Sequence, residues 1–110
     1  MTIKDIPKGT SRYIRANVHL NNVLTNITGS TINLIVKANK TDSNTDAVID
    51  TDADCLTSGS VGTAIIYLSP AETDITIGNY FYELFETKAT GEKAMLLDST
   101  FNITDRVRII

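Results

Sequence analysis

The chain has 110 residues, of which 42% are hydrophobic and 21% are charged, and its formal net charge is −3. This length suits one domain with a single core, and this composition excludes fibrous and disordered proteins. No apolar run approaches the roughly 20 residues of a membrane span, and residues 1–9 lack the apolar centre of a signal peptide, so we expect no membrane insertion.

The charges are distributed unevenly along the chain. Residues 1–40 carry six basic residues and one acidic residue (+5), residues 41–87 carry nine acidic residues and no basic residue (−9), and residues 88–110 carry four basic residues against three acidic ones (+1). The basic part of one copy could meet the acidic part of another; the alternative is that the charges intersperse on the folded surface. Nucleic acid is not expected as a partner, because phosphates need a basic face with base-stacking aromatics.

Residues 1–11 contain Pro7 and Gly9 and show little apolar pattern. They predict an N-terminal arm that lies across a neighbouring molecule and gains order only there. Residues 12–110 are predicted to form the folded domain.

Apolar and polar residues alternate through the first half of that domain. Residues 12–20 predict a strand with one wet face, and residues 31–38 repeat the pattern after a turn at 28–30. Residues 41–54 are polar and predict a loop with a short edge strand at 47–49. Residues 63–68 are apolar on both faces and predict a strand that is covered twice.

A short segment then combines a helical turn with the start of a strand. Ser69 is a candidate N-cap, Pro70 suits the first helical position, and Glu72 completes a capping box. The chain bends at Gly78 into a strand whose first inward residue is Tyr80. Its hydroxyl can reach back to the preceding corner, as the tyrosine corner of immunoglobulin-like sandwiches does.

The remaining strands are predicted at 79–87, 93–97 and 99–109, with a hairpin tip at 89–92. Phe81 and Phe85 lie on the second face of the first of these strands and need something to cover them. The sequence therefore predicts an all-β fold: an immunoglobulin-like antiparallel β-sandwich of about seven strands with one short helical turn.

Few residues suggest chemistry. The run Asp50-Thr51-Asp52-Ala53-Asp54 resembles the start of a calcium loop but lacks the later glycine and glutamate, so a solvated loop is expected. His19 and Cys55 are the only residues of their kinds. A carboxylate pair for glycoside hydrolysis could come from Glu83 and Glu86, or from Asp50 and Asp52, but no Trp is present to line a sugar cleft. We predict no enzyme activity, catalytic residue, metal or cofactor.

The order of several weak motifs carries a resemblance to a known family. Residues 29–37, 48–50, 62–68, 78–84 and 100–107 resemble, in order and spacing, the immunoglobulin-like N-terminal domain of tailed-phage baseplate upper proteins and related small virion proteins. The matching region covers about three quarters of the chain.

This resemblance implies a non-enzymatic structural component of a virion, made in the host cytoplasm and present in several symmetric copies. Its partners would be copies of itself and other virion proteins, and its place a baseplate or tail, as an adaptor or accessory protein. The alternatives are a head decoration protein, a carbohydrate or cell-surface binding module whose site would lie in residues 41–54, and a cytosolic regulatory or inhibitor domain. The absence of Trp weakens the carbohydrate alternative.

If the protein works by assembly, its exposed apolar residues are the candidates for contact with other subunits. A second, smaller internal core is the alternative for the two phenylalanines. Arg106 and Arg108 would flank the C-terminal contact with charge. The apolar interface candidates are Ile35, Ile65, Phe81, Phe85, Ile109 and Ile110.

Overall fold

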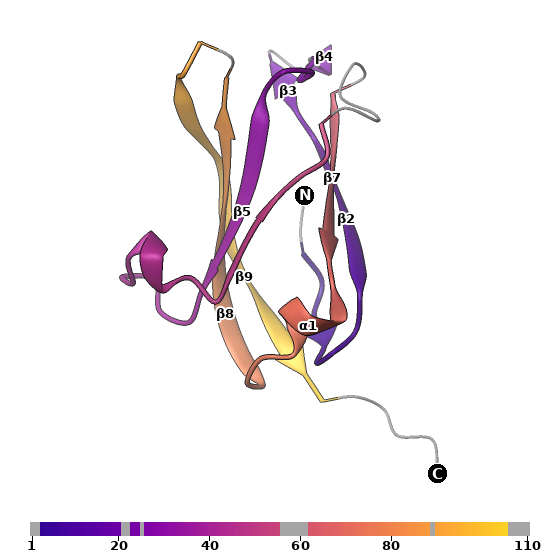
Figure 1. Ribbon diagram of the computed structural model, residues 1–110, viewed down its shortest axis with the longest axis vertical. Coiled ribbons are helices and arrows are strands. Elements are labelled where there is room, and N and C mark those ends of the chain that lie inside the picture. Colours follow the sequence, from indigo (N-terminus) through magenta and orange to yellow (C-terminus); the bar gives the residue numbers. More distant parts are fainter. Residues whose placement is uncertain (1–2, 21–22, 25, 56–61, 89, 106–110) are drawn as a thin grey trace.

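Two β-sheets face each other across the core in the computed structural model (Figure 1). The structure describes residues 3–20, 23–24, 26–55, 62–88 and 90–105. The elements in these ranges are β1 (Ile6–Pro7), β2 (Arg12–Asn17), β3 (His19–Leu20), β4 (Val23–Leu24), β5 (Thr31–Lys37), the 3-10 turn η1 (Asn44–Asp46), β6 (Ile49–Asp52), β7 (Thr63–Leu68), α1 (Pro70–Thr73), β8 (Gly78–Thr87) and β9 (Lys93–Thr104).

The larger sheet has the order β1-β9-β8-β5-β6. Its long strands pair antiparallel, but β1 runs parallel to β9, with Ile6 opposite Ile103. The sheet is therefore mixed, whereas the sequence pattern predicts antiparallel pairing only. The difference arises because the first strand comes from the segment that was expected to be an arm.

The smaller sheet consists of β2 and β7, which pair antiparallel from Arg12 opposite Leu68 to Asn17 opposite Thr63. The Val18 N–H then donates a hydrogen bond to the Gly62 carbonyl oxygen. The predicted strand at 12–20 divides here, and its last two residues form β3, which pairs with β4.

The core lies between the two sheets because alternate residues of each strand point inward. Tyr82 and Ile66 are almost fully buried, one from each sheet. The alternation predicted for β2 and β8 is confirmed, since Ile14, Ala16, Tyr80, Tyr82 and Leu84 are buried. The core cluster contains Ile14, Ala16, Ala64, Ile66 and Leu68 from the smaller sheet, and Ile6, Ile32, Leu34, Val36, Ile49, Tyr80, Tyr82, Leu84, Phe101 and Ile103 from the larger one; Ile3, Ile27 and Cys55 complete it.

The N-terminal segment packs on this core and does not extend as the expected arm. Ile3 is 4% exposed and Ile6 is fully buried. The Lys8 N–H donates to the Thr104 carbonyl oxygen, and the Asp5 carboxylate accepts from the Asn102 N–H. Two isolated isoleucines show no periodicity, so sequence pattern alone could not predict that they fill the end of the core.

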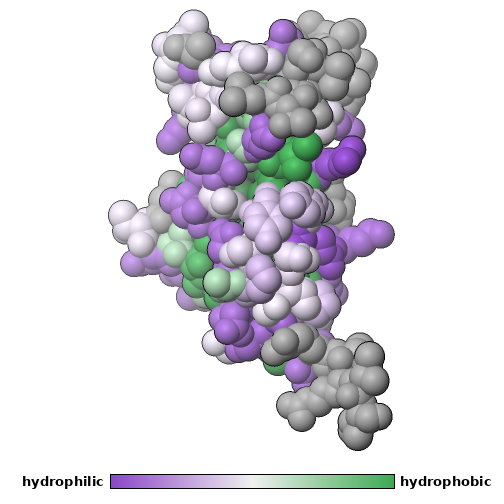
Figure 2. All heavy atoms as spheres, turned by 45° about the vertical axis from the view of Figure 1, so that its right-hand side comes forward, coloured by the Kyte–Doolittle hydropathy of each residue, from purple (hydrophilic) through white to green (hydrophobic). Residues whose placement is uncertain are grey.

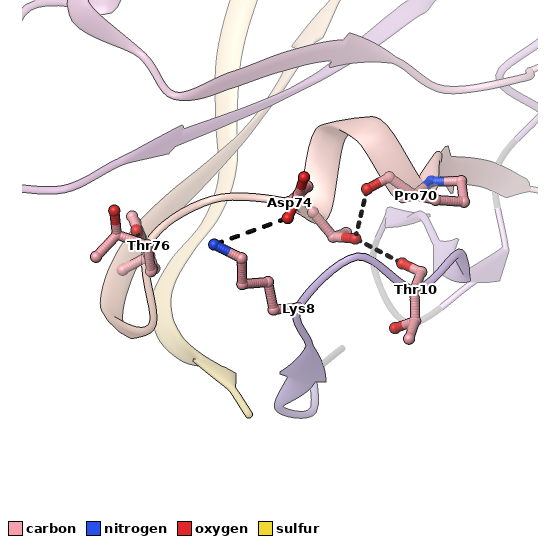
Figure 3. A network of polar contacts seen from close by, with 7 residues as sticks. Lys8, Thr10, Pro70, Asp74 and Thr76 are labelled. Atoms are coloured by element: carbon pink, nitrogen blue, oxygen red, sulfur yellow. Dashed lines mark hydrogen bonds and ion pairs between the residues drawn. The ribbon is translucent and has the colours of Figure 1, made fainter. Parts of the chain in front are cut away.

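The predicted capping box is present at α1. The Ser69 side chain accepts from the Glu72 N–H, and the Glu72 carboxylate accepts from the Ser69 N–H. Thr73, which is buried, donates its hydroxyl to the Thr10 carbonyl oxygen at 2.7 Å. Figure 3 shows the contact with Thr10, a second contact of the same hydroxyl with the Pro70 carbonyl oxygen, and the Lys8 ammonium directed at Asp74. These contacts tie α1 to the chain that enters β2.

Tyr80 begins the inward side of β8, and its hydroxyl donates to the carbonyl oxygen of Thr76 in the preceding corner. This is the geometry of a tyrosine corner, and the predicted contact is confirmed. Tyr80 itself is 6% exposed, so the ring fills the core while its polar end is satisfied.

β9 is one continuous strand of 12 residues, although the sequence pattern predicts two strands, at 93–97 and 99–109. The register with β8 shifts once, since Leu97 lies opposite Leu84 but Met95 lies opposite Phe85. Leu96 is therefore the extra residue of a β-bulge. The bulge changes the phase of the apolar pattern, which is why the sequence suggests a break.

Candidate functional site

The outer face of the larger sheet carries the predicted contact residues of β8. Phe81, Glu83 and Phe85 alternate with the core residues of this strand and are partly buried. In the pairing register with β5, they lie opposite Lys37, Ile35 and Asn33. This face is therefore a mixed surface, in which the rings of Phe81 and Phe85 lie on either side of Glu83 along β8.

Lys37 and Ile35 are buried on this outer face. The Lys37 side chain is only 7% exposed, and its ammonium lies 3.0 Å from the Glu83 carboxylate. Ile35 is 5% exposed and stands outside the core cluster, between Asp50 of β6 and Glu83 of β8 in the register. As a central strand residue with neighbours on both sides, Ile35 offers a partner little surface, in contrast to its prediction as a contact residue.

Phe81 and Phe85 each keep part of their ring surface accessible. The Lys93 ammonium lies 5.9 Å from the centre of the Phe85 ring, within the range of a cation–π contact. Phe81 borders a pocket of about 270 Å³. The pocket is lined by Lys40, Phe81, Tyr82, Glu83, Asp98, Ser99 and Thr100.

The outer edge of β9 is the longest exposed strand edge in the described part of the chain. β1 covers this edge only at Ile103 and Thr104. From Lys93 to Thr100, every residue whose side chain is described is exposed. These residues include two large apolar ones, Met95 at 53% and Leu96 at 37% exposure. Neither residue was singled out from the sequence, because the bulge that turns them outward breaks the simple alternation.

The outer face of the smaller sheet presents a pair of tyrosines. Tyr13 is 69% and Tyr67 is 43% exposed, and their ring centres are 4.8 Å apart. Ile65, a predicted contact residue, lies two residues from Tyr67 on the same face and is partly buried. Its backbone forms a bridge with Asp54. Figure 2 turns this side forward and shows hydrophobic patches among hydrophilic side chains. The prediction that β7 is covered on both faces is thus wrong.

The acidic run at 50–54 lies along β6 and beyond it. The Asn33 side-chain amide donates to Asp50 at 2.7 Å and to Asp52 at 3.1 Å, so it bridges the two carboxylates. Among the described residues, no group of three or more His, Cys, Asp or Glu side chains is placed to hold a metal ion.

The only cysteine is part of the core. Cys55 is 6% exposed, and burial raises the pKa of its thiol above the ordinary value of 9.0. Its thiolate fraction at neutral pH is therefore small, which makes it a weak nucleophile. His19 lies in β3, but its side chain is outside the described part of the structure.

The remaining predicted contact residues, Arg106, Arg108, Ile109 and Ile110, lie outside the described residues. Within the described residues, no helix has the length and apolar character needed to cross a membrane. No protein family, no curated protein and no solved structure matches this chain.

Proposed function

We propose that the protein is a non-enzymatic, immunoglobulin-like structural component of a tailed-phage virion. The strand order supports the immunoglobulin-like arrangement in this proposal. In immunoglobulin-like sandwiches, the second and fifth strands pair in one sheet, and the third, sixth and seventh pair in the other. When the short pair β3–β4 is left out, the second and fifth strands of this chain are β2 and β7, which pair, and the third, sixth and seventh are β5, β8 and β9, which are neighbours. The tyrosine corner stands at the start of β8.

The single observation that carries an assembly role is the exposed edge of β9. Long edge strands offer unpaired N–H and C=O groups to other chains, and proteins usually cover or charge them. β9 displays Met95 and Leu96 in the middle of its open edge, between the charged residues Lys93 and Asp98. Such an edge suits a protein whose strand completes a sheet with a neighbouring subunit.

The virion as location, with synthesis in the host cytoplasm, follows from the resemblance to baseplate upper proteins. In this proposal the partners are copies of the same chain and other virion proteins, in a baseplate, tail or accessory position. Neither nucleic acid nor a cofactor takes part. The outer face with Phe81 and Phe85 supplies a second contact beside the strand edge.

Particle association tests this proposal. Particles from cells that carry the gene are purified on a density gradient, and the protein is quantified in each fraction by mass spectrometry. We expect it to co-sediment with infectious particles in a fixed ratio to the major tail proteins. Recovery only from the particle-free fractions would contradict the proposal. As a control, a chain carrying an epitope tag at its N-terminus is detected with an antibody in the same fractions.

A carbohydrate-binding module is the second candidate, and the pocket beside Phe81 favours it. A partly exposed ring next to Asp98, Thr100 and Lys40 combines a flat apolar surface with hydrogen-bonding groups, as small-ligand sites do. Binding of the purified protein to a glycan array tests this function. Specific binding that Phe81→Ala abolishes and Tyr67→Ala preserves would favour it over assembly.

A further inference from the structure

The backbone of β9 presents hydrogen-bonding groups to solvent along its outer edge. The Asn102 N–H and the Thr104 carbonyl point to this edge, because they bond Asp5 and Lys8. Successive residues of a strand alternate between its two edges. Thr100 and Asp98 therefore direct their N–H and C=O groups to the same outer edge, where the described residues supply no strand beyond β1.

The side chains along this edge are arranged for pairing with an identical strand. Lys93 lies opposite Thr87 and Asp98 lies opposite Glu83, so both belong to the outer face of the sheet. If two copies of β9 pair antiparallel about a twofold axis between Met95 and Leu96, Lys93 of each copy stands opposite Asp98 of the other. Directly opposite residues of unlike charge stabilise an antiparallel pair.

The same axis places the exposed apolar residues together. Met95 of each copy stands opposite Leu96 of the other, which buries two side chains that are 53% and 37% exposed in the single chain. It also places the β-bulges of the two copies opposite each other. A bulge at an edge discourages pairing with a regular strand, so a second copy with the same irregularity is the partner that this edge accepts best.

We infer that the protein forms a twofold dimer in which two β9 strands pair edge to edge, with Lys93 opposite Asp98 of the second copy. The two five-stranded sheets then join into one sheet of ten strands. This inference rests on the proposed assembly role and specifies its first contact, the geometry of which is isologous. Other virion proteins would bind surfaces that remain free, such as the outer face with Phe81.

Charge exchange at the two positions tests the register. Sedimentation velocity across the micromolar range should show a monomer–dimer equilibrium for the natural chain. Lys93→Glu alone or Asp98→Lys alone creates two like-charge pairs in the dimer, so we expect dimerisation to weaken about tenfold or more. Mixing the two single variants should restore dimers, because only the mixed dimer has unlike charges at both positions.

Two exposed charges on other elements offer matched controls for these changes. Arg15 of β2 and Asp46 of η1 are exposed, and neither belongs to β9 or to the hairpin that leads into it. Arg15→Glu and Asp46→Lys alter the net charge by the same amounts and should leave dimerisation within about twofold of the natural chain. Circular dichroism and urea unfolding verify that each variant folds.

Amide hydrogen exchange locates the contact directly. Dimer formation should slow exchange of the Asp98 N–H, whereas the Tyr82 N–H, in the interior of the sheet, is already protected. A monomer at all concentrations, dimers that ignore both charge reversals, or protection only on the face with Phe81 would each overturn the inference. Particle association remains an independent result: a particle-bound protein without this dimer refutes the pairing alone, and a charge-sensitive dimer absent from particles refutes the virion role alone.

Discussion

The Lys37 ammonium lies 3.0 Å from the Glu83 carboxylate, on the outer face of the sheet formed by β5 and β8. The Lys37 side chain is 7% and the Glu83 side chain 20% exposed, so water screens this pair less than a surface ion pair. Each charge depends on the other for compensation. Removal of one partner leaves a poorly solvated charge behind, which is costly.

We therefore expect Lys37→Met and Glu83→Gln each to lower the free energy of unfolding by about 2 kcal/mol. The double variant should be less destabilised than the sum of the two, because neither charge is then left alone. Urea unfolding of the four proteins measures this coupling. The control pair, Lys88 and Glu92, is exposed and should show a coupling near zero; equal couplings in both pairs would contradict the argument from burial.

The tyrosine corner provides a second prediction. Tyr80→Phe removes the hydroxyl that bonds the Thr76 carbonyl oxygen and leaves the ring in the core. We expect a loss of about 1 kcal/mol in the free energy of unfolding, with the fold unchanged. Tyr13→Phe is the matched control, because that ring is 69% exposed, and it should change stability by less than about 0.5 kcal/mol.

Local motifs could be predicted from the sequence because all their partners are close along the chain. The capping box depends on Ser69 and Glu72, three residues apart, and the tyrosine corner on Thr76 and Tyr80, four residues apart. The inward faces of β2 and β8 follow from alternation within one strand, whereas β7 is apolar on both faces and its sequence does not distinguish them. Such features need no knowledge of the tertiary arrangement.

Features that depend on distant partners could not be predicted in this way. Ile6 joins β9 through residues almost a hundred positions later. Lys37 is expected on a wet face, and only the pairing of β5 with β8 brings Glu83 beside it. The prediction of the candidate site is affected most, because the bulge at Leu96 shifts the alternation that assigns the side chains of β9 to the two faces of the sheet. The exposed edge residues Met95 and Leu96 are visible only after strand pairing is known.

Stability should fall in alkaline solution because of two buried groups. Burial raises the pKa of Tyr80 above its ordinary value of 10.0 and that of Cys55 above 9.0. In the unfolded chain both groups lose their protons near the ordinary values. Above about pH 9 the folded state therefore holds more protons than the unfolded state, and the free energy of unfolding decreases as pH rises.

Urea unfolding between neutral pH and pH 11 measures this loss. Below about pH 9 the contribution of both groups is fully present, so the curve should be flat with respect to them. Cys55→Ala should remove the earlier part of the alkaline decline and Tyr80→Phe the later part, whatever their effect at neutral pH. An unchanged alkaline slope in both variants would show that other groups cause it.

The last prediction concerns the N-terminal segment, which was expected to be an arm but packs on the core. Ile6 is fully buried and pairs with β9. Ile6→Ala should therefore lower the free energy of unfolding by about 2–4 kcal/mol, since truncation of a buried isoleucine leaves a cavity. Ile77→Ala, at a position that is 51% exposed, serves as the control and should cost less than about 1 kcal/mol. An arm that only contacts a neighbour would leave the unfolding of the monomer unchanged in both variants. Measurement at low protein concentration, where the inferred dimer would dissociate, separates the two cases: a loss confined to the Ile6 variant assigns the segment to the core of its own chain.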